Sequence, residues 1–403
     1  MTARSTIGAA VILLGWALAG CTGGSPTAVR SVHPSNATES PKGISQPSPS
    51  PVATPYVPAP PVLPIGPVPQ GFSPASVTFV SPQVGWVLGT APCGATSCIS
   101  LLRTRDVGRT WVSIPPPPTQ FYTGRPAGVR MVRFADVNDG WVFDPELWAT
   151  HDGGAHWQRP TLPGAASPPF VVALEAAAGV VHAVLFDASA KVRIESSPVG
   201  ADSWDLSPVT IPVGAGPVPS AQLVLQGSTG WLTEVDRTVI GGARLAHGHW
   251  LTWQPPCASA GGSAVLAAST PTSLVAVCHE GTWTSGPETV HAYFSSNGGA
   301  SFRRAARELP QAFGGVVGSP RPGAVIAGGY ADDGTDGLLA TYDGGTSWTT
   351  VYRGAPANGT TEAELGFTSA AQGVVIETHT GVGTLLMTFD GGHQWQPVRF
   401  QPT

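Results

Sequence analysis

An eight-residue pattern that recurs along the chain constrains the fold more than any other feature. Each copy has Thr or Ser first, Asp or Asn two residues later, Gly two residues after that, and Trp or Phe at the end. Five copies begin at Thr104, Thr150, Ser295, Thr341 and Thr388. Adjacent copies start 46 or 47 residues apart, but 145 residues separate Thr150 from Ser295. A gap about three repeats long predicts two further, degenerate copies inside it.

Two segments fit those places. Ser197 to Trp204 has lost the Asp and Gly positions, and in Ala246 to Trp253 the residues His247-Gly248-His249 take over the turn. With them, seven copies start at residues 104, 150, 197, 246, 295, 341 and 388, at intervals of 46 to 49 residues. We expect the missing Asp to loosen these two turns without undoing the fold.

A second repeat precedes the first. Val77 to Phe79 is followed by Gly85 to Val87, and Val132 to Phe134 by Gly140 to Val142, so each unit has two short apolar strands around a polar turn. Glycine (51), proline (41) and a charged fraction of only 11% fit many short strands and tight turns. Together the repeats predict an all-β, seven-bladed β-propeller of four-stranded antiparallel blades over residues 72–403.

The eight-residue pattern resembles the Asp-box, or BNR repeat. Its acidic position is expected to accept hydrogen bonds from nearby backbone N–H groups, while glycine supplies positive φ angles and the aromatic residue packs against its neighbours. We therefore assign a structural role to the residues at this position: Asp106, Asp152, Asn297, Asp343 and Asp390.

Asp-box propellers include sialidases, xyloglucanases, sortilin-type receptors and the photosystem II stability and assembly factor family, and this chain looks most like the last. That resemblance implies a non-catalytic, extracytoplasmic protein-binding or assembly scaffold. The alternative is a glycan-active enzyme, sialidase-like or another glycoside hydrolase, or a lectin. The Arg-Ile-Pro segment usual in sialidases is absent, and the carboxylate pair of a glycosidase cannot be identified from sequence. No catalytic residue and no cofactor is predicted.

The N-terminus resembles a bacterial lipoprotein signal. Arg4 precedes an apolar run from Ile7 to Leu18, and Leu18-Ala19-Gly20-Cys21 resembles a lipobox. Residues 1–20 are predicted to be a signal peptide and Cys21 the acylated, palmitate-bearing residue that anchors the protein on the outer side of the cell membrane. In the alternative, the signal is an ordinary cleaved one and Cys21 is incidental.

Residues 21–71 form the predicted tether. This stretch is rich in Pro, Ser, Thr and Ala and has few charges, so it is not expected to bury enough apolar surface to fold. In an extended form it reaches on the order of 100 Å.

The net charge of -5 and the lack of a Lys or Arg run argue against a nucleic-acid partner. The expected partners are an extracytoplasmic protein or envelope component and, through the lipid, the membrane. We expect a monomer.

Four cysteines remain for an oxidising compartment. They allow three disulfide pairings, and proximity favours Cys93 with Cys98 and Cys257 with Cys278. A four-thiolate zinc site is the alternative, but neither pair has the spacing of a zinc knuckle, and no metal site is predicted.

In an up-and-down blade, the loop between strands two and three shares a face with the inter-blade connection, and we expect binding there. Both proposed disulfides fall on this face. Its candidate residues are Phe121, Tyr122, Arg125, Asp144, Glu146, Arg237, Tyr330, Asp332, Asp333, Asp336 and Arg353.

Three groups on the chain have competing interpretations. Asp332, Asp333 and Asp336 resemble a calcium loop, but without a bidentate Glu they favour a polar hairpin. His247 and His249 are more typical of an exposed turn than of a metal site. Phe121, Tyr122 and Arg125 suit stacking on a sugar or peptide, or packing under the proline-rich loop that holds them.

Overall fold

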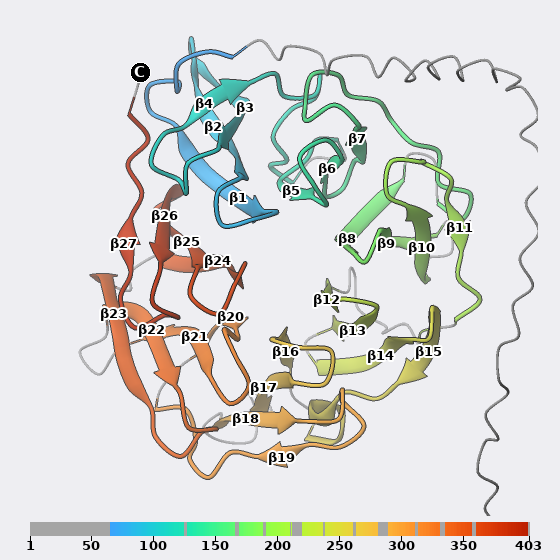
Figure 1. Ribbon diagram of the computed structural model, residues 1–403, viewed down its shortest axis with the longest axis vertical. Coiled ribbons are helices and arrows are strands. Elements are labelled where there is room, and N and C mark those ends of the chain that lie inside the picture. Colours follow the sequence, from blue (N-terminus) through green and yellow to red (C-terminus); the bar gives the residue numbers. More distant parts are fainter. Residues whose placement is uncertain are drawn as a thin grey trace, which may run out of the picture. The chain divides into compact units, whose positions relative to one another are not determined.

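The computed structural model shows seven antiparallel β-sheets arranged as blades around a central channel (Figure 1). It describes residues 65–124, 127–165, 169–187, 191–209, 211, 220–236, 238–260, 263–280, 289–310, 313–330, 335–356 and 360–401. The prediction of a seven-bladed β-propeller is confirmed. Cys21, the signal peptide and nearly all of the predicted tether lie outside the described residues.

Each blade uses consecutive strands, numbered from the channel outward. The first four blades contain β1 (Ser73–Phe79), β2 (Gly85–Cys93), β3 (Thr96–Thr104) and β4 (Val112–Ile114); β5 (Met131–Phe134), β6 (Gly140–Phe143) and β7 (Trp148–Thr150); β8 (Phe170–Ala177), β9 (Val180–Phe186), β10 (Val192–Pro198) and β11 (Asp205–Leu206); and β12 (Ser220–Gln226), β13 (Thr229–Asp236), β14 (Thr238–Ala246) and β15 (His249–Trp253).

The last three blades contain β16 (Ala264–Ala268), β17 (Leu274–Glu280), β18 (Thr289–Ser295) and β19 (Arg303–Arg304); β20 (Phe313–Gly318), β21 (Val325–Tyr330), β22 (Thr335–Thr341) and β23 (Thr349–Pro356); and β24 (Thr360–Phe367), β25 (Gly373–His379), β26 (Val382–Thr388) and β27 (Gln396–Pro397). A 3-10 helix, η1 (Pro256–Ala260), lies between β15 and β16.

Blade two has three strands because its fourth is cut short. Gln158 pairs with Ala149 of β7 through an isolated antiparallel bridge, at the place where a fourth strand would run. Pro160 follows two residues later and has no N–H to donate, so the ladder cannot continue past it.

Residues near both ends of the described chain close the ring between blades seven and one. Gly66 pairs with Ser113 of β4, and Val68 is buried in the same cluster as Trp111 and Met387. Phe400 packs on Trp111 at 5.5 Å between ring centroids. Ordered contacts therefore begin before β1.

The five intact repeats form one kind of turn between the third and fourth strands. In blade one, Thr104 Oγ1 donates to Asp106 Oδ1 at 2.9 Å, and the N–H of Gly108 donates to Thr104 Oγ1 at 3.0 Å. In blade six, hydrogen bonds led by those from Ser347 lower the pKa of Asp343 to about 2. The acidic side chains are thus engaged by their own turns.

A further backbone bond joins each intact turn to the loop between strands one and two of its own blade. In blade two, the N–H of Gly153 donates to Asn138 O at 2.8 Å, and in blade seven, Gly391 donates to Ala371 O at 2.8 Å. We call this side of the ring the turn face. The opposite side, which carries the loops between strands two and three and the inter-blade connections, is the connection face.

The two degenerate turns are ordered by other means. In blade three, Ser203 N–H donates to Ser197 Oγ at 2.9 Å, while Asp202 reaches His151 of blade two at 3.0 Å. In blade four, His247 and Gly248 form a two-residue hairpin turn with positive φ angles of 52° and 78°. Both histidines of that turn are exposed, as expected.

Candidate functional site

The connection face of blade two brings several of the predicted residues together. Phe121, Tyr122 and Arg130 come from the connection between blades one and two, and Asp144 and Glu146 from the loop between β6 and β7. Two backbone bonds hold these segments side by side: Arg130 N–H donates to Phe143 O at 3.0 Å, and Glu146 N–H donates to Gly128 O at 3.1 Å. We call the following residues the blade-two cluster: Phe121, Tyr122, Arg130, Asp144, Glu146, Trp148 and Arg159.

Two arginines of this cluster present charge over aromatic rings. Arg130 lies 5.3 Å from the centroid of Tyr122, and Arg159 lies 4.5 Å from that of Trp148. The two arginine side chains are 51% and 55% exposed, so their charged heads remain accessible to a partner. A guanidinium group stacked on a ring presents both a flat apolar surface and hydrogen-bond donors.

Two carboxylates hold these arginines in place. Arg130 Nε donates to Asp144 Oδ2 at 2.6 Å, and burial raises the pKa of Asp144 against the effect of that bond. Glu146 accepts from Arg159 at 3.0 Å, from Thr119 at 2.7 Å and from Trp148 Nε1 at 3.1 Å. Burial opposes ionisation of Glu146, but these bonds lower its pKa overall. Each carboxylate therefore positions an arginine.

The disulfide prediction is confirmed for both pairs. Cys93–Cys98 closes the loop between β2 and β3, and Cys257–Cys278 ties η1 to the end of β17. Both lie on the connection face, as expected from their place in the blades.

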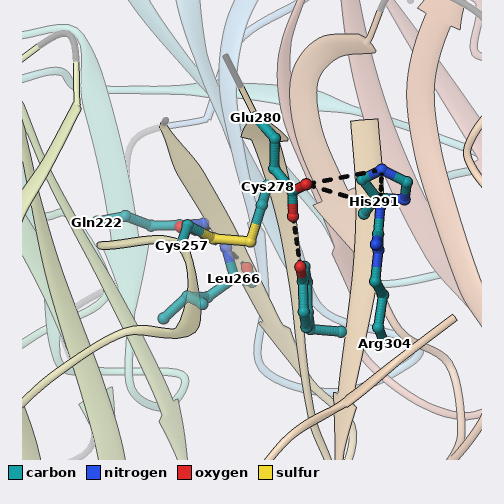
Figure 2. Close-up of a disulfide and its surroundings, with 8 residues drawn as sticks. Gln222, Cys257, Leu266, Cys278, Glu280, His291 and Arg304 are labelled. Atoms are coloured by element: carbon teal, nitrogen blue, oxygen red, sulfur yellow. Dashed lines mark hydrogen bonds and ion pairs between the residues drawn. A yellow bond between two sulfur atoms is a disulfide. The ribbon is translucent and has the colours of Figure 1, made fainter. Parts of the chain in front are cut away.

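Figure 2 shows Cys257–Cys278 beside Glu280, His291 and Arg304. Tyr293 donates a hydrogen bond to Glu280, and burial together with this bond raises the pKa of Tyr293 to about 12. The phenol therefore stays protonated near neutral pH and donates to Glu280. Arg304 hydrogen-bonds Nε2 of the buried His291, which also lies 3.7 Å from Glu280 Oε2. This group packs between blades four and five, away from the channel.

A charged group lines the central channel. Arg133 of β5 donates from Nε to Glu175 of β8 at 2.6 Å and from Nη1 to Glu364 of β24 at 2.8 Å. Glu364 also accepts the N–H of Val77 in β1 at 2.7 Å. One guanidinium group thus connects the innermost strands of blades seven, two and three, and Glu364 extends the connection to blade one. Burial raises the pKa of Glu175, although Arg133 favours its charged form.

The channel contains a cavity of about 760 Å³. Apart from the charged group, its lining is mainly small and apolar, and it includes Ala221, Val265 and Val317. It has room for a side chain or a sugar unit. Among the described residues, no group of three or more His, Cys, Asp or Glu is arranged to hold a metal ion.

The remaining predicted residues are scattered over other blades. Tyr330 ends β21, and Arg353 lies exposed within β23, not in an inter-blade loop. Asp336 is buried at 1% exposure in β22. Arg125, Arg237, Asp332 and Asp333 lie outside the described residues.

Sequence reasoning missed the residues that organise both sites. Arg130, Trp148 and Arg159 were not among the candidates, and neither were Arg133, Glu175 and Glu364. A signal for the channel group exists: each member is a charged residue in the first strand of its blade, where the neighbouring positions are apolar. A charged residue in the first strand of a blade therefore predicts a charged group that lines the channel.

No helix among the described residues is both long and apolar enough to span a membrane.

No family model and no curated protein matches the sequence. Solved structures do. A structure of YCF48 bound to a D1 peptide is 17% identical with a TM-score of 0.53, covering 83% of this chain and 98% of its own. The propeller domain of a trilobed protease from Pyrococcus furiosus is 8% identical with a TM-score of 0.54, covering 82% and 96%. A lectin from Burkholderia pseudomallei is 14% identical with a TM-score of 0.51, covering 82% and 99%. What these proteins share with this chain is the β-propeller fold.

Proposed function

We propose that the protein is a non-catalytic extracytoplasmic scaffold that binds a protein segment through its connection face, with the blade-two cluster as the contact site. The observation that carries this proposal is the pair of exposed guanidinium groups stacked on Tyr122 and Trp148 and fixed by Asp144 and Glu146. Arginine and aromatic side chains held in one geometry are typical of the residues that dominate binding energy at protein interfaces. The similar YCF48 structure holds a peptide.

The matched pair Arg159→Ala and Arg321→Ala tests this assignment. Arg159→Ala removes an exposed guanidinium from the blade-two cluster, and Glu146 keeps its bonds to Thr119 and Trp148. We expect capture of a partner from solubilised membranes of the producing cells to fall about tenfold. Arg321 also stacks on a tyrosine, Tyr342 at 5.7 Å, but from the loop between β20 and β21 on the turn face. Its replacement should leave capture unchanged, and an equal loss in both variants would contradict the assignment.

We also propose that Cys21 carries the lipid that anchors the protein to the outer side of the cell membrane. The lipobox-like Leu18-Ala19-Gly20-Cys21 supports this proposal. Cys21→Ser should move the protein from the membrane fraction to the soluble fraction, as measured by immunoblotting after cell lysis. Retention of the variant in the membrane fraction would count against lipidation at this residue.

The alternative is a glycan-active enzyme, and the convergence of Glu175 and Glu364 in the channel favours it. Glycosidases use two carboxyl groups that flank the scissile bond. Both are engaged by Arg133, however, and Glu364 also binds the backbone of Val77. Hydrolysis of a glycosidic reporter by the wild-type protein, lost in Glu175→Gln, would replace the scaffold proposal with this one.

A further inference from the structure

Two carboxyl groups lie buried at the seam between blades six and seven. Asp336, at the start of β22, is 1% exposed, and Glu377, near the end of β25, is 7% exposed. Both positions are at the connection-face ends of their strands. Burial, with a smaller contribution from the nearby charge of Asp336, raises the pKa of Glu377 to about 7.

These carboxyl groups lack the partners that buried charges require. Asp336 Oδ2 and Glu377 Oε1 are fully buried, and neither has a hydrogen-bond partner among the described residues. The second oxygen of Glu377 accepts one hydrogen bond from the described residues, a long one of 3.3 Å from Tyr352. Burying a carboxylate without compensation costs several kcal/mol, so such pairs are normally neutralised by a cation or a proton.

Glycine at position 354 lets the backbone of β23 approach these oxygens closely. A Cβ atom on Gly354 would lie 3.1 Å from Glu377 Oε1 and 3.4 Å from the backbone oxygen of Asp336. Oxygens from two blades therefore border one small space, with Tyr352 Cε1 also 3.4 Å from that point. A side chain other than glycine would fill this space.

We infer that this seam binds a calcium ion, held by the carboxylates of Asp336 and Glu377 and the backbone oxygen of Asp336. One shared proton neutralises one carboxyl group and leaves the other charge uncompensated, whereas one divalent cation compensates both. Calcium accepts carboxylate and carbonyl oxygens in irregular geometry and completes its shell with water, and weak sites of this kind have dissociation constants of about 0.1–1 mM. The ion would join blades six and seven at the connection face.

Thermal unfolding of the purified protein with and without calcium chloride tests this inference. With about 5 mM calcium at pH 7.5, we expect the wild-type Tm to rise by about 2 °C. Asp336→Asn and Glu377→Gln should abolish the rise. Glu195→Gln is the matched control, because Glu195 is also a fully buried carboxyl group with an unpartnered oxygen, but it lies in blade three. It should keep the rise.

Terbium luminescence gives a second measurement that does not depend on stability. Terbium should bind the wild-type protein saturably, compete with calcium and be sensitised by the ring of Tyr352, so Tyr352→Phe should weaken the signal. Gly354→Ala keeps both carboxylates but crowds their space, and it should lower calcium affinity by about tenfold or more. An unchanged wild-type Tm in calcium, together with Glu377→Gln being more stable than wild type, would show that protons alone neutralise the seam and would overturn the inference.

Discussion

Replacing Arg133 with methionine is expected to lower the free energy of unfolding by about 3 kcal/mol, one of the largest effects of any single substitution in the channel. Arg133 is the only cation in contact with Glu175 and Glu364 among the described residues. Its removal leaves two partly buried carboxylates facing each other across the innermost strands. Urea unfolding followed by tryptophan fluorescence should show a lower midpoint with an unchanged slope.

Replacing both glutamates in the Arg133→Met protein distinguishes the effect of the lost ion pairs from the effect of lost side-chain packing. Arg133→Met combined with Glu175→Gln and Glu364→Gln should recover most of the lost stability, because no uncompensated charge remains. If the single variant is as stable as the wild type, the charged group contributes nothing to holding blades two, three and seven together.

Gly383→Ala is expected to destabilise the protein by about 3 kcal/mol or more by forcing blades seven and one apart. A Cβ atom at Gly383 would lie 1.8 Å from Pro74 O, a backbone atom of blade one that no side-chain rotation can move. The N–H of Gly383 also donates to Ser73 Oγ at 2.8 Å across the same seam. The added methyl group would strain the contact that closes the ring.

Gly366→Ala is the control for this substitution, because Gly366 is another strand glycine of blade seven with no atom within 4 Å of a built Cβ. Alanine there should change stability by less than about 1 kcal/mol, and in the stabilising direction, since glycine costs more backbone entropy on folding. Thermal and urea unfolding of both variants checks the comparison. If Gly383→Ala and Gly366→Ala lower stability equally, the loss does not come from the close approach of blades seven and one.

Seven blades could be predicted from the sequence because each blade repeats its own local chemistry. The turn that begins at Thr104 uses hydrogen bonds within eight residues, so its pattern survives in the sequence and marks each blade. The disulfides followed from the same topology, since the position of Cys257 and Cys278 within their blades placed both on one face.

The sites were harder to predict because they depend on contacts between distant residues. Arg133 and Glu364 are 231 positions apart in sequence, and only the closed ring brings them together. Arg159 and Glu146 are 13 positions apart and meet where the end of blade two lies beside the loop between β6 and β7. Asp336 was considered as part of a polar loop, whereas the structure buries it against blade seven. Such contacts form only when the whole propeller closes, and no local sequence pattern predicts them.

Position-specific crosslinking tests the central claim, that one face of this propeller binds a protein partner, most directly. A photoreactive benzophenone amino acid would replace Tyr122 on the connection face or Phe389, which is 49% exposed in the repeated turn of blade seven, on the turn face. After irradiation of intact cells, we predict a discrete protein adduct from position 122 and none from position 389. Equal adducts from both positions, or an adduct from position 389 alone, would contradict the account.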